Sequence, residues 1–378
     1  TVTTLTGTAA TANTAYASSG ISGLGNEAVT LSDTSLATTV LNTLDGNTTG
    51  AVNAATITTL TGTAATANTA YASSGISGLG NEAVTLSDTS LASSVLNTLD
   101  GNTTGAVNAA TVTTLTGLAA DANTAYASSG ISGLGNEAVT LSDTSLAADV
   151  LNTLDGNTTG AVNAATVTTL TGTYSDVNTS YTANTASTIT GLGNEAVALS
   201  DLSISASNLS SIDGLTTGDV TTSAITITGT YSEINTVYTA SGIDGLGDEA
   251  ITASGTLTVA QANTLDGYTT GVVTATISDT TSTTLASLTG TGNAYTITVG
   301  STTTAAADLN TIDAATTVSV TATAVTTLTG TAAAANTAYA SSGITGLGNE
   351  AVTLSDTSLA TTVLNTLDGN TTGAINAA

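Results

Sequence analysis

The stretch Leu31–Gly50, LSDTSLATTVLNTLDGNTTG, decides the organisation of this chain, because it returns almost unchanged at Leu86–Gly105, Leu141–Gly160 and Leu354–Gly373. The copies lie inside blocks of 55 residues that cover 1–55, 56–110, 111–165 and 324–378, with diverged sequence over 166–323. A fixed internal period of this size indicates a repeat architecture. We therefore predict one continuous solenoid over 1–378 rather than several globular domains.

Each block contains two similar halves, and an Asn-Thr pair marks both of them. The first seven marker asparagines alternate between spacings of 29 and 26 residues, and these are Asn13, Asn42, Asn68, Asn97, Asn123, Asn152 and Asn178. The series continues at Asn208, Asn235, Asn263, Asn310, Asn336 and Asn365, with one unmarked segment around 278–290. The sequence therefore predicts coils of about 27 residues, one for each half-block.

The segment before the marker is typical of a β-strand. In Ala28–Ser32 the apolar side chains of Val29 and Leu31 alternate with polar ones, as on a half-buried strand. Asp33 and Thr34 follow as cap residues. We expect a strand over 28–32 in each equivalent position.

From residue 35 the spacing of apolar residues changes to that of a helix. One face carries Leu36, Val40, Leu41 and Leu44. Gly46 stands where a C′ glycine would end the helix. The tyrosine-bearing half-block follows the same rule through Ala9, Ala12 and Tyr16, so the repeated tyrosines are expected to fill the core.

A strand, a short helix and a turn rich in Gly, Asn and Ser, repeated about every 27 residues, are typical of a β/α solenoid in the style of leucine-rich repeats. Parallel strands would stack along one face and helices along another, and the general preference for right-handed crossovers favours a right-handed coil. The alternative is an all-β solenoid, a parallel β-helix, which the many Thr, Val and Ser residues would also suit.

Composition excludes several classes of function. The chain has no Lys, Arg, His or Cys, and its net charge is −27. Nucleic acid and anionic membranes are unlikely partners, because both are bound through basic side chains. The usual general bases and nucleophiles His, Cys and Lys are missing, and the carboxylates of the first block are all copied in the later blocks. We therefore expect no enzymatic activity and no catalytic or cofactor-binding residues.

Calcium is the one cofactor that the residues suggest, because carboxylate and amide oxygens are its preferred ligands. The candidate metal ligands in the first two blocks are Glu27, Asp33, Asp45 and Asn47, and Glu82, Asp88, Asp100 and Asn102. Their spacing matches neither an EF-hand loop nor the calcium-binding nonapeptide. The alternative interpretation makes Asp33 an N-cap and Asp45–Asn47 a turn.

Two further motifs have simple structural explanations. GLGNE at Gly23–Glu27 and its copies lacks the GK[ST] of a phosphate loop and ends in an acidic residue, so we interpret it as a tight corner. Threonine pairs such as Thr3-Thr4 suggest an ice-binding face, but a regular TxT register is not sustained.

The phrases VTTLTGTAA, ISGLGNEAVTLSD and VLNTLDGNTTG resemble the giant tandem-repeat cell-surface proteins of marine picocyanobacteria and related bacteria, which are linked to swimming motility and adhesion. The resemblance covers the whole chain. A weaker likeness, limited to TAATANTAYA and VLNTLDG, is to phage tail-fibre repeats. The main resemblance implies secretion, an extracellular or cell-surface location and a spacer or fibre role.

Two functions from different classes follow. The first is a structural repeat region of a large surface protein, a rigid spacer, sheath or filament whose partners are copies of itself or adjoining repeats of one longer chain. The chain begins without Met and stops at a block boundary, which favours a window of something longer. The second is a calcium-dependent adhesin that engages glycans or other cells, with residues 166–323 as the distinctive part. An ice-binding surface is a minor alternative.

Overall fold

The computed structural model describes residues 1–377 and contains repeated β–α elements with parallel sheets. The chain divides into two compact units, Thr1–Ala196 and Val197–Ala378, which we call the N-terminal and C-terminal units and describe separately. The predicted continuity of a single solenoid over 1–378 stays a prediction. Within the described residues there are fourteen helices, so the repeat is a β/α one and the all-β alternative is wrong.

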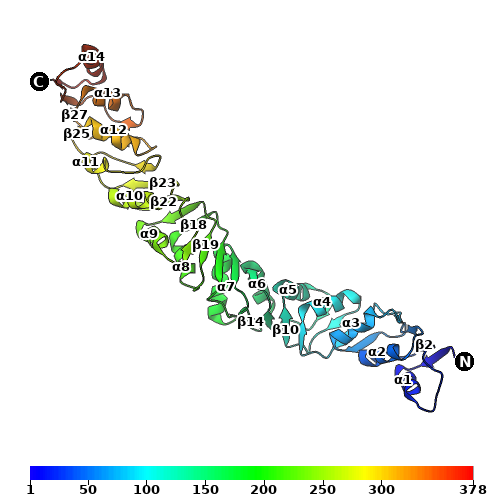
Figure 1. Cartoon of the computed structure of the whole chain (residues 1–378). Coiled ribbons are helices and arrows are strands. Elements are labelled where there is room, and N and C mark those ends of the chain that lie inside the picture. Colours follow the sequence, from blue (N-terminus) through cyan, green and yellow to red (C-terminus); the bar gives the residue numbers. More distant parts are fainter. Residues whose placement is uncertain (378) are drawn as a thin grey trace. The chain divides into compact units, whose positions relative to one another are not determined.

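In the N-terminal unit each helix packs against the next one along the chain (Figure 1). The helices are α1 (Ala9–Ala17), α2 (Thr38–Asn47), α3 (Ala64–Ala72), α4 (Ser93–Asn102), α5 (Ala119–Ala127), α6 (Ala148–Asn157) and α7 (Tyr174–Ala186). Its strands are β1 (Thr4–Gly7), β2 (Ala28–Leu31), β3 (Ser35–Ala37), β4 (Val52–Asn53), β5 (Thr59–Gly62), β6 (Ile76–Ser77), β7 (Ala83–Leu86), β8 (Ser90–Ala92), β9 (Val107–Asn108), β10 (Thr114–Gly117), β11 (Ile131–Ser132), β12 (Ala138–Leu141), β13 (Ser145–Ala147), β14 (Val162–Asn163), β15 (Thr169–Gly172) and β16 (Ile189–Thr190).

The C-terminal unit repeats this arrangement with more variation. Its helices are α8 (Ala206–Asp213), α9 (Tyr231–Thr239), α10 (Val259–Asp266), α11 (Ser282–Leu285), α12 (Ala306–Ala314), α13 (Ala332–Ala340) and α14 (Thr361–Asn370). Its strands are β17 (Ala196–Leu199, from Val197 on), β18 (Ser203–Ser205), β19 (Val220–Thr222), β20 (Thr226–Gly229), β21 (Ile243–Asp244), β22 (Ala250–Leu257), β23 (Val273–Ile277), β24 (Ala294–Thr296), β25 (Thr303–Ala305), β26 (Val320–Thr321), β27 (Thr327–Gly330), β28 (Ile344–Thr345), β29 (Ala351–Leu354) and β30 (Ile375–Asn376).

The sheets are parallel, and their register differs from the spacing of the helices. In the sheet β3-β5-β7-β9-β11, Ser35 pairs with Thr59 and Thr59 with Ala83, a step of 24 residues. Helices α2, α3 and α4 begin at residues 38, 64 and 93, so they recur after 26 and then 29 residues. One sheet therefore takes up a different segment of the block at each step: SLA, TLTG, AVTL, VN and then IS.

The core is aliphatic and lies between the sheets and the helices. Val29 and Leu31 are buried from β2, and Leu41 and Leu44 are completely buried from α2, as their spacing predicts. Leu36 is buried as well, but it belongs to the short strand β3 rather than to the helix. The predicted apolar stripe is therefore buried at Leu36, Leu41 and Leu44 but only half-buried at Val40, and the prediction of where the helix begins was wrong.

Two predicted helix-end signals are corrected by the structure. Gly46 lies inside α2, whose C-cap is Thr48, because helical turns continue through Asn47. Asp33 does not cap the helix that follows it. That helix has Ala37 at its N-cap, with no hydrogen bond from a capping side chain.

Candidate functional site

The GLGNE segment forms a corner built around a buried glutamate. In the second block Glu82 is completely buried, and its Oε2 accepts hydrogen bonds from the backbone N–H of Gly80 at 2.9 Å and of Asn81 at 3.2 Å. The hydroxyl of Tyr71 donates to the same oxygen at 3.0 Å. Gly80 has φ +134°, a backbone conformation that favours glycine. The corner interpretation of this motif is therefore supported in atomic detail.

The same corner recurs through both units. The equivalent pairs of tyrosine and glutamate are Tyr16 with Glu27, Tyr126 with Glu137, Tyr181 with Glu195, Tyr238 with Glu249, and Tyr339 with Glu350. In four of the corners the second carboxylate oxygen is buried and has no hydrogen-bond partner among the described residues, namely in Glu27, Glu82, Glu137 and Glu350. These carboxylates are fixed inside the repeat, and their function is to hold the corner closed.

The electrostatics of the corner favour a carboxylate beside a neutral phenol. Burial raises the pKa of Tyr339 to about 12, and the nearby Glu350 adds to that rise. The hydrogen bond from the backbone of Gly25 lowers the pKa of Glu27 below its ordinary value. The raised pKa of Tyr16 and the lowered pKa of Glu27 favour a protonated phenol that donates a hydrogen bond to a charged carboxylate. Such a hydrogen bond is stronger than one between neutral groups.

Asp33 and its equivalents cap a helix of the preceding half-block. The Oδ2 of Asp33 accepts a hydrogen bond from the backbone N–H of Ala9, the first residue of α1, at 2.8 Å. The same contact joins Asp88 to Ala64 at 2.8 Å. A carboxylate at a helix N-terminus also interacts favourably with the helix dipole. The predicted capping role is correct in kind, but the helix that is capped is the earlier one.

The remaining predicted metal ligands also have protein partners. The Oδ2 of Asp100 accepts from the hydroxyl of Ser128 at 2.7 Å, and Asp45 has the same contact with Ser73. Asp45 and Asn47 lie in α2, not in the predicted turn, and Asn102 occupies the same place in α4. The side-chain amides of Asn47 and Asn102 each donate to the side-chain oxygen of the marker asparagine in the preceding half-block, at 2.9 Å in both cases.

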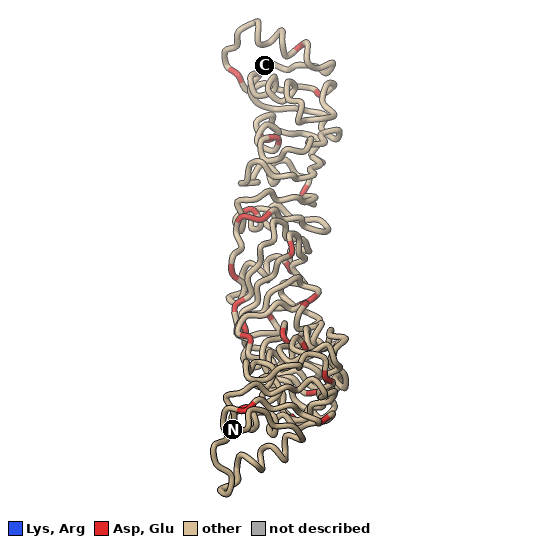
Figure 2. Tube along the Cα trace, turned by 90° about the vertical axis from the view of Figure 1, so that its right-hand side faces the viewer, with Lys and Arg blue, Asp and Glu red and all other residues tan. Residues whose placement is uncertain are grey.

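The predicted ligands therefore point to different places in the block and are not gathered around one point. Among residues 1–377 no group of three or more His, Cys, Asp and Glu side chains could hold a metal ion. Figure 2 shows acidic residues recurring along both units with no basic side chain among them. No helix in the described part of the chain has the length and apolar character needed to cross a membrane.

The marker asparagines form a ladder that joins neighbouring helices. The side-chain amide of Asn42 donates to the backbone oxygen of Thr66 in α3 at 2.9 Å, and that of Asn97 donates to Asp121 in α5 at 2.9 Å. Corresponding bonds start from Asn13, Asn68, Asn123, Asn152, Asn263, Asn310 and Asn336. The marker that defines the period in the sequence is thus the residue that fastens one half-block to the next.

Between α8 and α9 the ladder position carries no asparagine. Ser210 is the fifth residue of α8, as Asn42 is of α2, whereas the predicted marker Asn208 is the third. The alignment is fixed by the aspartate three residues later, since a Cβ on Gly242 would lie 2.2 Å from Asp213, as one on Gly75 would lie 2.1 Å from Asp45. Asn208, which the sequence reasoning used as a marker of the period, is therefore not the equivalent of Asn42, and Ser210 occupies that position.

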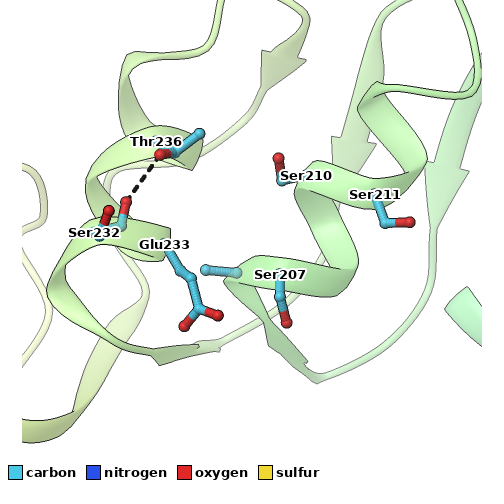
Figure 3. A pocket seen from close by; sticks show the side chains of 7 residues that line it. Ser207, Ser210, Ser211, Ser232, Glu233 and Thr236 are labelled. Atoms are coloured by element: carbon cyan, nitrogen blue, oxygen red, sulfur yellow. Dashed lines mark hydrogen bonds between the residues drawn. The ribbon is translucent and has the colours of Figure 1, made fainter.

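A groove of about 360 Å³ lies where the asparagine is missing. Figure 3 shows that its lining side chains come from both helices, Ser207, Ser210 and Ser211 from α8 and Ser232, Glu233 and Thr236 from α9. The carboxylate of Glu233 accepts from the backbone N–H of Thr230 at 2.8 Å and from its hydroxyl at 2.9 Å. Sequence reasoning missed this groove because it followed the asparagines, whereas the buried leucine and isoleucine of α8 would have given the correct alignment.

Comparisons of the chain with protein-family models, with curated proteins and with solved structures find no match.

Proposed function

We propose that this chain is a non-enzymatic structural repeat region of a large extracellular or cell-surface protein, serving as a rigid spacer, sheath or filament. In this proposal the half-blocks are right-handed coils of about 27 residues, similar to leucine-rich repeats, and neighbouring coils are copies of one another in this chain or in adjoining repeats. The observation that carries the proposal is the asparagine ladder, which repeats the same contact between successive helices.

The contacts of each half-block support a mechanical role. A half-block is joined to its neighbours by parallel strand pairing, by a ladder amide and by an aspartate that caps an earlier helix. Each of these contacts connects residues that are 24 to 27 positions apart. Because each element is held by elements of the adjacent half-blocks, stability should grow with the number of half-blocks, as in other repeat proteins.

The test is to remove one whole block. Deleting residues 56–110 joins 55 to 111 and restores the same junction, AVNAA followed by TVTTLTG. We expect the shortened protein to keep its helix content per residue in circular dichroism and to have a smaller maximum dimension in small-angle X-ray scattering. Deleting residues 56–93 is the matched control, because it removes a part of a block and breaks the register of the strands.

The outcome decides between a spacer and a folded unit that needs all its parts. If the deletion of 56–110 unfolds the protein as thoroughly as that of 56–93, or leaves its maximum dimension unchanged, the spacer proposal is wrong. The alternative of a calcium-dependent adhesin has no cluster of carboxylates to support it among the described residues. A binding role has one specific feature in its favour, the groove between α8 and α9.

A further inference from the structure

The interface between α8 and α9 lacks side chains that are present at the equivalent α2–α3, α4–α5, α6–α7 and α12–α13 interfaces. At the α2–α3 interface, Asn42 donates to the next helix and the hydroxyl of Ser73 donates to Asp45. In α8 and the segment after α9 these two donors are replaced by Ser210 and Ala240. Among the described residues no side-chain hydrogen bond from Ser210 reaches α9. The α8–α9 interface therefore lacks both of these hydrogen bonds, and a groove lies beside it.

The lining of this space is polar and almost entirely made of hydroxyl groups. Ser207, Ser210 and Ser211 come from α8, and Ser232 and Thr236 come from α9. The hydroxyl of Thr236 already donates to the backbone oxygen of Ser232 at 2.8 Å, and that of Ser207 shares a hydrogen bond with Ser205 at 3.1 Å. The other three hydroxyls make no side-chain hydrogen bond among the described residues, so they can donate to and accept from a ligand that offers both kinds of group at short intervals. The only apolar lining residue is Ala206, which leaves little for an apolar ligand to bury against.

The charges of the lining residues restrict which class of ligand the groove could bind. Glu233 is the one ionised group of the lining, and the chain has no Lys or Arg to attract an anion. The carboxylate already accepts two hydrogen bonds from Thr230, which closes the capping box of α9. A single carboxylate committed in this way is a poor site for a metal ion, which needs several oxygen ligands. An uncharged ligand is favoured over an anion or a metal ion.

We propose that the groove between α8 and α9 binds a neutral saccharide. A ring with several adjacent hydroxyls matches the alternating donors and acceptors of the lining, and a volume of about 360 Å³ falls within the range of small-molecule sites, roughly 300–1,000 Å³. The sugar occupies the space that a ladder asparagine fills elsewhere. This site goes beyond the structural role proposed above, and either proposal can fail without the other.

The equivalent α6–α7 interface of the N-terminal unit shows what the asparagine contributes where it is present. It carries a carboxylate at the position of Glu233, namely Asp176, together with the hydroxyls of Thr153 and Thr179. There the amide of Asn152 lies between the helices and donates to the backbone oxygen of Asp176 at 2.9 Å. Restoring an asparagine at position 210 should likewise fill the groove and reconnect the helices.

The experiment measures the binding of three neutral trisaccharides, maltotriose, cellotriose and mannotriose, to the full chain by isothermal titration and saturation-transfer NMR. We expect at least one of them to bind with a dissociation constant of about 1 mM, as for a small polar site without aromatic contacts. Ser210→Asn should weaken that binding at least about tenfold. The control Ser94→Asn, at an exposed position of α4, should leave it unchanged.

Two charged probes separate the proposal from its competitors. Trigalacturonic acid should bind more weakly than the neutral sugars, because Glu233 repels it. Cadaverine tests for an ammonium site, and Glu233→Gln removes the charge while a glutamine can still close the capping box. The proposal is overturned if none of the neutral sugars binds, if Ser210→Asn leaves their binding unchanged, or if cadaverine binds more tightly and loses that binding in Glu233→Gln.

Discussion

Removing the tyrosine hydroxyl from one corner should destabilise that corner by about 2 kcal/mol. In Tyr71→Phe the buried Glu82 loses the donor that stands 3.0 Å from its Oε2 and keeps only the N–H groups of Gly80 and Asn81. A hydrogen bond to a charged group contributes about 1.5–3 kcal/mol, and the phenylalanine ring retains the packing of the tyrosine. The lost free energy should therefore come from the hydroxyl alone.

The matched control is Tyr231→Phe. Tyr231 is the half-buried first residue of α9, and its hydroxyl makes no hydrogen bond among the described residues. Its substitution should change stability by less than about 0.5 kcal/mol. Because a repeat array does not unfold in two states, a local measurement is needed beside the urea unfolding curve.

Amide hydrogen exchange supplies that local measurement. The amides of Gly80 and Asn81 donate to Glu82 and should exchange about 30-fold faster in Tyr71→Phe, the factor that corresponds to about 2 kcal/mol. The amides of Gly135 and Asn136, which form the same corner in the next block, should be unaffected. Equal effects of Tyr71→Phe and Tyr231→Phe, or unchanged exchange at Gly80, would refute the role that we assign to the phenol–carboxylate pair.

Four other predictions follow from the same contacts. Because burial raises the pKa of Tyr339 to about 12, the unfolded state releases its phenol proton first, so stability should be full below pH 10 and fall as the pH rises towards 12, which thermal melts between pH 8 and 12 would show. Asn97→Ala should cost about 1–2 kcal/mol in urea unfolding, whereas the exposed Thr98→Ala should cost less than about 0.5 kcal/mol. With a net charge of −27 the melting temperature should rise with NaCl or CaCl₂, and a much larger effect of CaCl₂ at equal ionic strength would indicate specific metal sites. Ser210→Asn should stabilise the C-terminal unit by about 1 kcal/mol in urea unfolding, because it restores one hydrogen bond between helices.

The sequence predicts the local elements of the block better than their connections. The alternation of Val29 and Leu31 and the spacing of Leu41 and Leu44 identify a strand and a helix, because both patterns reflect which side of a single element is buried. The two-residue strands such as Val52–Asn53 have no such pattern of their own. They exist because the sheet continues at a step of about 24 residues, and that step is a property of the packed repeat.

For the acidic residues, too, the sequence predicts the local role better than the contact partner. Local propensity correctly marks Asp33 as a capping residue, but nothing near it in the sequence says that the helix it caps begins 24 residues earlier. Similarly, Glu27 looks like a turn residue, and its burial depends on Tyr16 from the preceding helix. These partners lie 24 and 11 residues earlier in the chain, so the sequence indicates the role of such a residue but not the partner that it contacts.

Repetition also changes how a departure from the pattern should be interpreted. In an ordinary domain a serine such as Ser210, on the surface of a helix, would attract no attention. Here the equivalent positions of α2, α4, α6 and α12 carry an asparagine that donates a hydrogen bond to the next helix. The serine therefore marks an interface from which this hydrogen bond is missing. Such a loss is tolerated because strand pairing on both sides still holds the half-block, as β18 with β20 and β20 with β22 show. An interface that lacks a hydrogen bond present at four equivalent interfaces is a place where a binding function would be expected.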